Sequence, residues 1–297
     1  MIHVLSAHLQ SARWLSLQLR ALEEFIRAPF QLVWSIEDIR EEEIPRHKAS
    51  TRIVPQCGDH AGKLNALAQL VIADARAADL LVFLDGDALP VGPLDGVFDL
   101  ARRGRLVAVR RDENDGDPQP HPSFCAVSVR QWRAIGGNWE VGPHWRDGTG
   151  AAVTDVGARL WATLRERRIE WTPLLRTVHH SLHPVWFGVY ANIVYHHGAA
   201  FRFPRLRADA AQSRLRHRGK AEREDWLRHV ATHSRELGEL VYARLARLEP
   251  HSILSRCRDG SLFAGLSTAL REPERRLAPE GGNPTPPAPV VGAEFDE

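Results

Sequence analysis

The amino-acid sequence predicts an α/β protein with a mostly parallel sheet and helices on both faces. Short apolar segments of strand length alternate with segments of helical periodicity over about the first 110 residues, which is the order of a parallel sheet with crossover helices. The apolar run Leu80–Leu84 is closed by Gly86 and Pro90, as in a strand buried on both faces. Asp85 and Asp87 follow that run directly, at the strand end where ligands bind in open α/β sheets.

Each expected element follows from a local pattern. Strands are expected at 2–7, 30–36, 52–55, 80–84 and 106–109, and helices at 11–26 and from Gly62 to about 78. Beyond residue 110 the polar, turn-rich composition predicts a loop to 122. A strand is expected at 124–129, a helix at 131–135 that Gly136 and Gly137 end, a helix at 154–167 capped by Thr154, a strand at 169–171 and an apolar stretch at 185–195.

Composition excludes several classes of protein. The 297 residues are 43% hydrophobic and 26% charged, as in soluble globular proteins, and a net charge of +2 gives no general electrostatic reason to expect nucleic acid as a partner. Cys57, Cys125 and Cys257 are far apart, which argues against a zinc knuckle or a disulfide framework. Without a signal-peptide pattern or an apolar window of membrane-span length, we expect a cytoplasmic protein.

The segment Asp85–Gly86–Asp87 is a candidate metal site. Gly86 permits a sharp turn, so both carboxylates can point into one pocket. Carboxylate oxygens suit Mg²⁺ and Mn²⁺, which commonly also bind substrate phosphates. The alternative is a solvated loop that caps the next helix, because Asp and Gly are common turn residues.

Two helix starts carry further candidates. Lys63 and Asn65 lie at a helix start, where a lysine and the helix dipole favour a phosphate, although most lysines are simply solvated. Asp155 and Arg159 are spaced for one helix face. They indicate either a site acid or an ordinary helical ion pair.

A late segment adds histidines and an arginine. His196 and His197 follow an apolar stretch and precede Arg202. A histidine here can complete a metal site, and the arginine can neutralise a diphosphate. Adjacent histidines also occur for purely structural reasons.

Taken together, these segments resemble nucleotide-sugar glycosyltransferases of the GT-A fold, close to the family-two enzymes and their relatives. The resemblance covers residues 2–202. In this resemblance, the base- and ribose-binding edge of the family corresponds to Ser6, Ala7, Glu37 and Asp38. The nucleotide pocket corresponds to Lys63–Asn65, and the D-x-D metal motif corresponds to residues 81–87. The resemblance also matches the acceptor side to 124–129 and 136–140, and a D-L-x-x-R-L helix with its following strand to 155–160 and 169–173.

The resemblance implies a metal-dependent glycosyltransferase that uses a nucleotide-diphosphate sugar as donor. In this interpretation, Asp87 and one of His196 and His197 hold Mn²⁺ or Mg²⁺ on the diphosphate, while Asp85 contacts the ribose, a metal-bound water or the metal. Lys63 and Arg202 add positive charge where negative charge develops. The acceptor hydroxyl, on a glycan, a lipid-linked compound, a protein or a small molecule, stays unidentified.

One departure from the family concerns the general base. Many inverting members carry Glu-Asp before the acid of the 155–160 helix, but this chain has Ala152 and Val153 there. Asp155 is then the best candidate for activating an acceptor hydroxyl or for contacting the sugar. Asp147 in the preceding loop is a second candidate base, and a retaining mechanism would need neither.

Three regions are expected along the chain. Residues 1–204 form the transferase domain, with a nucleotide-binding half of about 1–110 and an acceptor-side half of about 111–204. Residues 205–270 form a helical extension, and 271–297 a disordered tail. The basic segment Arg205–Arg223 is interpreted as a solvated helix face, with peripheral membrane contact as the alternative.

Other classes of protein compete with this interpretation. The missing Glu-Asp permits a non-catalytic nucleotide-sugar-binding protein. Asp85 and Asp87 could form the carboxylate pair of a haloacid-dehalogenase-like phosphohydrolase, but that motif normally follows the first strand. A sugar-nucleotide pyrophosphorylase needs a Gly-rich, basic segment after strand one, and Ser6–Ser11 lacks it.

Overall fold

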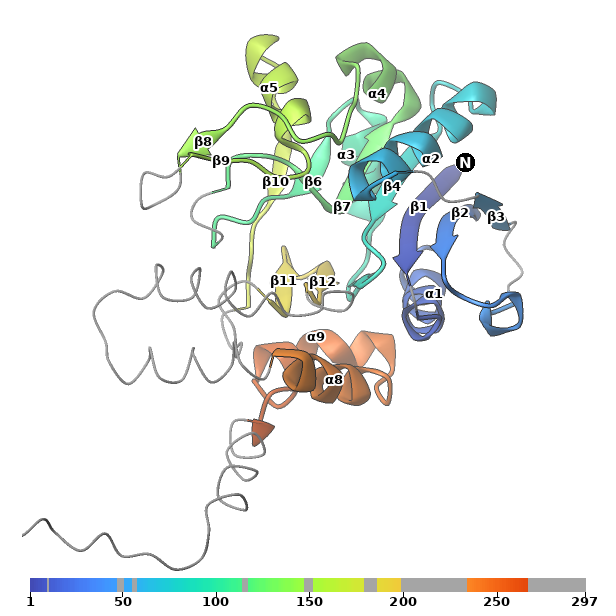
Figure 1. The fold of residues 1–297 in the computed structure, drawn as a ribbon, viewed down its shortest axis with the longest axis vertical. Coiled ribbons are helices and arrows are strands. Elements are labelled where there is room, and N and C mark those ends of the chain that lie inside the picture. The colour runs from blue at the N-terminus through green and yellow to red at the C-terminus, as the bar shows by residue number, and fades with distance from the viewer. Residues whose placement is uncertain are drawn as a thin grey trace, which may run out of the picture. The chain divides into compact units, whose positions relative to one another are not determined.

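The structure is a computed structural model that describes residues 1–9, 11–46, 51–54, 58–113, 117–146, 152–178, 186–198 and 234–266. The chain divides into two units, Met1–Ala264 and Gly265–Glu297. All the helices and strands named below belong to the first unit, which Figure 1 displays as a ribbon.

A seven-stranded sheet forms the centre of the first unit, in the order β10-β6-β7-β4-β1-β2-β3. Its strands are β1 (Ile2–Leu9), β2 (Phe30–Glu37), β3 (Thr51–Val54), β4 (Leu80–Leu84), β6 (Val107–Val109), β7 (His121–Ser128) and β10 (Thr172–Leu174). β7 runs antiparallel to β4 and β6, whereas the other neighbours pair in parallel. The predicted fold class, a mostly parallel α/β sheet flanked by helices, is therefore confirmed.

Helices cover both faces of this sheet (Figure 1). They are α1 (Arg13–Phe25), α2 (His60–Asp74), α3 (Asp95–Arg102), α4 (Val129–Ile135) and α5 (Ala158–Glu166). Successive side chains of β4 point to opposite faces of the sheet, which explains the two layers of helices. Leu80, Val82 and Leu84 pack with α1 and α3, while Leu81 and Phe83 pack with α2, α4 and α5. Burying each such side chain contributes about 1.5–3 kcal/mol, so the unbroken apolar run fixes β4 in the middle of the sheet.

A second, three-stranded sheet brings the late histidines to the end of β4. It consists of β11 (Gly188–Tyr190), β12 (Val194–His196) and β5 (Ala88–Pro90), all antiparallel. His196 is opposite Ala88 in this register. The pairing places a histidine that is remote in sequence directly beside Asp87. A short ribbon of β8 (Trp145–Arg146) and β9 (Ala152–Val153) completes the strands.

Two C-terminal helices, α8 (Ser234–Leu245) and α9 (Pro250–Arg258), pack on α1. Arg13 donates two hydrogen bonds of 2.5 Å to Glu239 of α8, and His251 of α9 lies 2.9 Å from a Glu24 oxygen of α1. The predicted domain boundary near residue 204, the basic segment Arg205–Arg223 and the predicted tail 271–297 lie outside the described residues.

Two expected elements near residue 160 are shifted. The helix predicted to start at Thr154 starts at Ala158, because Gly157 takes a left-handed conformation with φ 94°. A Cβ at Gly157 would lie 2.2 Å from the Pro120 carbonyl oxygen, so only glycine fits this turn. Thr154 instead bonds Gly142 through its hydroxyl. The strand expected at 169–171 is β10, three residues later.

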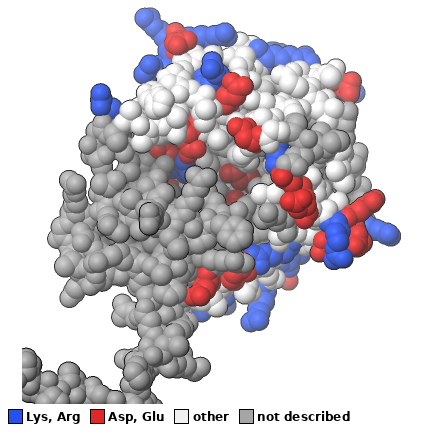
Figure 2. Space-filling view, viewed as in Figure 1, with Lys and Arg blue, Asp and Glu red and all other residues white. Residues whose placement is uncertain are grey.

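The described residues carry charges of both signs on the face of the molecule drawn in Figure 2. Their basic and acidic side chains are interspersed there. Within the described ranges, no helix combines the length and apolarity needed to cross a membrane.

Candidate functional site

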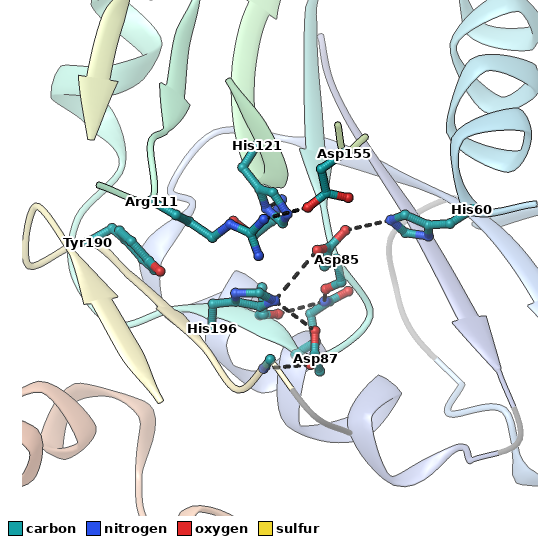
Figure 3. A network of polar contacts seen from close by, with 12 residues as sticks. His60, Asp85, Asp87, Arg111, His121, Asp155, Tyr190 and His196 are labelled. Atoms are coloured by element: carbon teal, nitrogen blue, oxygen red, sulfur yellow. Dashed lines mark hydrogen bonds and ion pairs between the residues drawn. The ribbon is translucent and has the colours of Figure 1, made fainter. Parts of the chain in front are cut away.

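Asp85, Asp87 and His196 form a buried group at the end of β4. One ligand-type atom from each lies within 4.8 Å of the others. Figure 3 shows the three side chains pointing toward one another from the β4–β5 turn and from β12. The structure thus brings Asp85 and Asp87 together with one of the two predicted histidines.

The turn between β4 and β5 is held by a buried glutamine. The Gln18 side-chain amide of α1 donates to the carbonyl oxygens of Asp85, at 2.9 Å, and Ala88, at 2.7 Å. The Ala88 N–H also donates to the Asp85 carbonyl at 2.9 Å. These hydrogen bonds satisfy the carbonyl groups of the turn, so the two carboxylates are not used to hold the turn and are left to face the site.

Asp87 is held in its ionised form. Its Oδ2 accepts a hydrogen bond from the Gly198 N–H at 2.8 Å, and its Oδ1 lies 3.4 Å from His196 Nε2. Burial would raise the pKa of Asp87, but His196, His197 and the Gly198 N–H hold that pKa below its ordinary value. A carboxylate whose pKa is lowered in this way is ionised at physiological pH and is suited to binding a cation.

Asp85 has two histidine neighbours. His60 Nε2, at the start of α2, lies 3.0 Å from Asp85 Oδ1, and His196 Nε2 lies 3.6 Å from Oδ2. Burial lowers the pKa of His60, but the Asp85 carboxylate outweighs that effect and raises it overall. His60 was not among the site residues expected from the sequence. Its only signal was a position three residues before Lys63, at the same helix start.

His197 is not part of the acidic group, so the geometry favours His196 as the ligand of the two. The His197 ring is 1% exposed and its Nδ1 lies 3.0 Å from the Tyr195 hydroxyl. Its ring centroid lies 4.8 Å from Trp14 and 4.9 Å from Phe187. Burial lowers the pKa of His197 to about 4, so the ring is neutral at physiological pH.

The end of β1 adds a further buried histidine to the surroundings of Asp87. His8 is 2% exposed, and its ring centroid lies 5.9 Å from Trp34. Burial lowers the pKa of His8 to about 3, although the negative charge of Asp87 acts in the opposite direction. Ser6, one of the predicted nucleotide-edge residues, is fully buried, and Ala7 is half-buried. Their nucleotide-binding role stays a prediction.

The predicted nucleotide pocket contains an ion pair and a structural amide. Lys63 pairs with Glu37 at the end of β2, and both side chains are mostly buried. Asp38 is exposed. The Asn65 amide donates to Asn138 at 2.9 Å and accepts from the Trp139 N–H at 2.9 Å. Asn65 thus ties α2 to the Gly-Gly turn segment, while the phosphate role of Lys63 stays a prediction.

Asp155 lies in the loop before α5 and pairs with Arg111, so of the two alternatives for Asp155 and Arg159 the helical ion pair is wrong. The Arg111 Nη2 donates to Asp155 Oδ2 at 2.7 Å and to Asp117 Oδ2 at 3.0 Å. The Val156 N–H donates to Asp155 Oδ1 at 2.8 Å. Arg159 instead approaches Glu140, at 3.3 Å. The Gly157 turn causes the difference, because it directs Asp155 away from the helix.

Arg111 connects this acid to the body of the site. It is 9% exposed, and its two carboxylate partners outweigh burial and raise its pKa. Figure 3 shows its guanidinium reaching toward Asp155 beside His121, whose ring centroid lies 5.7 Å from that of His196. Arg111 has no motif around it, and its place in the polar loop after β6 was the one hint to its role. The other predicted residues, Asp147 and Arg202, lie outside the described residues.

Comparisons with known proteins identify no family. No protein-family profile matches the sequence, and no curated protein sequence is significantly similar to it. The solved structures that match include two of the galactosyltransferase LgtC, one in complex with donor and acceptor sugar analogs and one of an active-site mutant. Their TM-scores are 0.33 and 0.32, each at 13% identity.

The chain spans less than two thirds of the enzyme in these matches. Each alignment covers 44% of this chain and 59% of the LgtC chain. With TM-scores this low, the similarity to LgtC carries no argument about the activity of this chain. The chemistry of the site's own residues therefore carries the functional proposal.

Proposed function

We propose that the protein is a metal-dependent glycosyltransferase that moves a sugar from a nucleotide-diphosphate sugar to an acceptor hydroxyl. One observation carries the proposal: Asp85, Asp87 and His196 converge within 4.8 Å at the carboxyl end of β4. That is the sheet edge where nucleotide ligands bind in open α/β proteins. The GT-A resemblance of the sequence supports the same conclusion.

The donor set fits a divalent cation. Two carboxylates and one imidazole suit Mn²⁺, which accepts both oxygen and nitrogen ligands, while Mg²⁺ prefers oxygen alone. Asp87 is ionised, as a metal ligand must be. When bound, such a cation would supply a Lewis acid next to the departing nucleoside diphosphate.

The protein's own groups would orient the donor and the acceptor. The His60 side chain is 42% exposed and lies 3.0 Å from Asp85 Oδ1. The Asp155 carboxylate is 38% exposed, and both its oxygens already accept hydrogen bonds. This arrangement supports a contact with a sugar hydroxyl more than removal of a proton, so the base assignment to Asp155 stays a prediction.

A thermal-shift experiment tests the donor and the metal together. A ligand that binds the native state at 100 times its Kd stabilises it by about 2.7 kcal/mol. The protein would be screened with nucleoside diphosphates and their sugars, each with MnCl₂, with MgCl₂ and with EDTA. We expect stabilisation by at least one nucleotide in the presence of Mn²⁺ and none with EDTA. Equal shifts with metal and with EDTA would contradict the proposal.

The Arg111–Asp155 ion pair favours a second candidate, a protein that binds a nucleotide sugar without transferring it. Asp155 is the candidate base that lies among the described residues, and its carboxylate is already held by the Arg111 guanidinium. A nucleotide-sugar hydrolysis assay with Mn²⁺ separates the two. Metal-dependent release of the nucleotide identifies an enzyme, while metal-dependent binding without release identifies the second candidate.

A further inference from the structure

Helix α8 lies outside the part of the chain that resembles glycosyltransferases, yet it contacts the segment that carries His196. The contact is made by Gly238, which has no side chain. A Cβ built there would lie 3.4 Å from Nε2 of His197. The backbone of α8 therefore packs directly against the imidazole ring.

His197 is enclosed by side chains from several elements. Trp14 of α1 and Phe187 lie against its ring, and the Tyr195 hydroxyl lies 3.0 Å from its Nδ1. With Gly238 at Nε2, the ring has contacts from α1, α8, β12 and the segment before β11. In a close-packed interior, moving one of these elements displaces the ring.

The backbone of His197 is tied to Asp87. The His197 N–H donates to the Asp87 carbonyl at 3.1 Å, and the next N–H, of Gly198, donates to the Asp87 carboxylate at 2.8 Å. The His197 carbonyl accepts from the Phe187 N–H at 3.2 Å. A displaced ring would thus change the geometry of Asp87 and of the neighbouring His196 together.

Helix α8 is fixed in place by α1. Arg13 donates two hydrogen bonds to Glu239, and its guanidinium lies 4.3 Å from the centroid of the Tyr242 ring. Tyr242 also packs on Trp14, with ring centroids 4.9 Å apart, and donates its hydroxyl proton to the Arg13 carbonyl at 3.2 Å. Trp14 therefore contacts both Tyr242 of α8 and the His197 ring.

We propose that α8 is a structural part of the metal centre, with His197 as the positioning residue through which it holds Asp87 and His196. This inference rests on the metal binding proposed above. It assigns a role to a helix that the glycosyltransferase resemblance does not cover.

The test compares two substitutions on the same helix. The full chain is treated with EDTA and titrated with Mn²⁺, with the free ion followed by electron paramagnetic resonance well below the melting temperature. Gly238→Leu pushes a side chain onto His197 and should weaken Mn²⁺ binding about tenfold, as changes behind a metal ligand commonly do. Ala243→Leu, at an exposed position of α8, should bind Mn²⁺ like the wild type.

A double-mutant cycle shows whether the effect passes through His197. In the His197→Ala background the ring is gone, so Gly238→Leu should change Mn²⁺ affinity little further. Independent, additive effects would contradict the role of His197 as the connecting residue.

The outcomes separate this inference from the proposed function. If the wild type does not bind Mn²⁺, the proposed function fails and the inference fails with it. If the wild type binds and folded Gly238→Leu binds equally well, only the role of α8 is overturned. Should Gly238→Leu not fold, Gly238→Val is the smaller variant: its Cβ would lie at ordinary contact distance, 3.4 Å from His197 Nε2, and its two methyl groups would add bulk beside the ring. This variant should weaken binding about two- to threefold, and wild-type affinity would overturn the inference.

Discussion

Two pairs of carboxylates lie in the same site but have different partners. Among the described residues, the ion pairs of Asp85 and Asp87 are with histidines alone. Asp155 and Asp117 share the guanidinium of Arg111. An imidazole is itself a metal ligand, whereas a guanidinium is a permanent cation that binds no metal. The first pair is therefore available to a bound cation, while the second pair already shares a permanent cation of the protein.

This difference predicts two kinds of failure. Removing Arg111 takes a buried positive charge from the second pair, so the folded state itself should suffer. Removing Asp87 takes one negative charge from a group that has no guanidinium partner among the described residues, so ligand binding should suffer instead. Variants in the two pairs can thus be told apart by measuring stability and metal affinity in parallel.

Arg111→Met should have the largest effect, a loss of unfolding free energy on the order of 3 kcal/mol, because it breaks a buried ion pair from one side. Urea denaturation in EDTA measures it. The control is Arg105→Met, which removes a pair with Glu170 in which both side chains are largely exposed. Such surface pairs contribute under about 1 kcal/mol. Equal losses in the two variants would mean that Arg111 contributes no more than a surface arginine.

Asp87→Asn should lower Mn²⁺ affinity by at least about 100-fold, equivalent to about 2.7 kcal/mol. The amide keeps the shape of the side chain but removes the charge that a cation needs. Calorimetric titration of the EDTA-treated protein measures the change, with Asp155→Asn as the control from the other pair. If Asp87→Asn keeps the full metal-dependent thermal shift, the metal site is wrongly assigned.

Much of this arrangement could be predicted from local sequence. The unbroken run Leu80–Leu84 identifies a strand buried on both faces, and the chain direction of such a strand places Asp85 and Asp87 at the ligand edge. The late histidine segment was also identified. Choosing between His196 and His197 needed the register of β12 on β5, which places His196 opposite Ala88.

The partners of these carboxylates could not be predicted, because they come from distant segments. His60 and Arg111 carry no motif, and each meets its acid only through the fold. Asp155 was expected inside a helix because its spacing to Arg159 has helical periodicity. The left-handed Gly157, packed against the Pro120 carbonyl, starts the helix later. A tertiary contact therefore overrode the local pattern.

His60→Ala should lower Mn²⁺ affinity about tenfold, as the loss of a group that orients a metal ligand commonly does. The His60 ring lies 3.0 Å from Asp85 Oδ1, so its removal frees that carboxylate to rotate. His251→Ala is the matched control, since His251 makes a similar pair with Glu24 at 2.9 Å on an exposed surface. Its Mn²⁺ affinity should equal that of the wild type. Unchanged affinity in His60→Ala would show that Asp85 needs no such support.

Asp155→Asn should have the smallest effect, a change in turnover of less than about tenfold at saturating substrate, with a raised KM for the sugar substrate. Both oxygens of Asp155 already accept hydrogen bonds, from Arg111 and from the Val156 N–H. A substrate hydroxyl would share one of these oxygens with its present donor. Transfer of the hydroxyl proton to Asp155 would then weaken the ion pair with Arg111. Asparagine can still accept a hydrogen bond from a hydroxyl, so the contact survives in part. A loss of about 10²–10⁴ in turnover with donor binding unchanged would instead identify Asp155 as the general base.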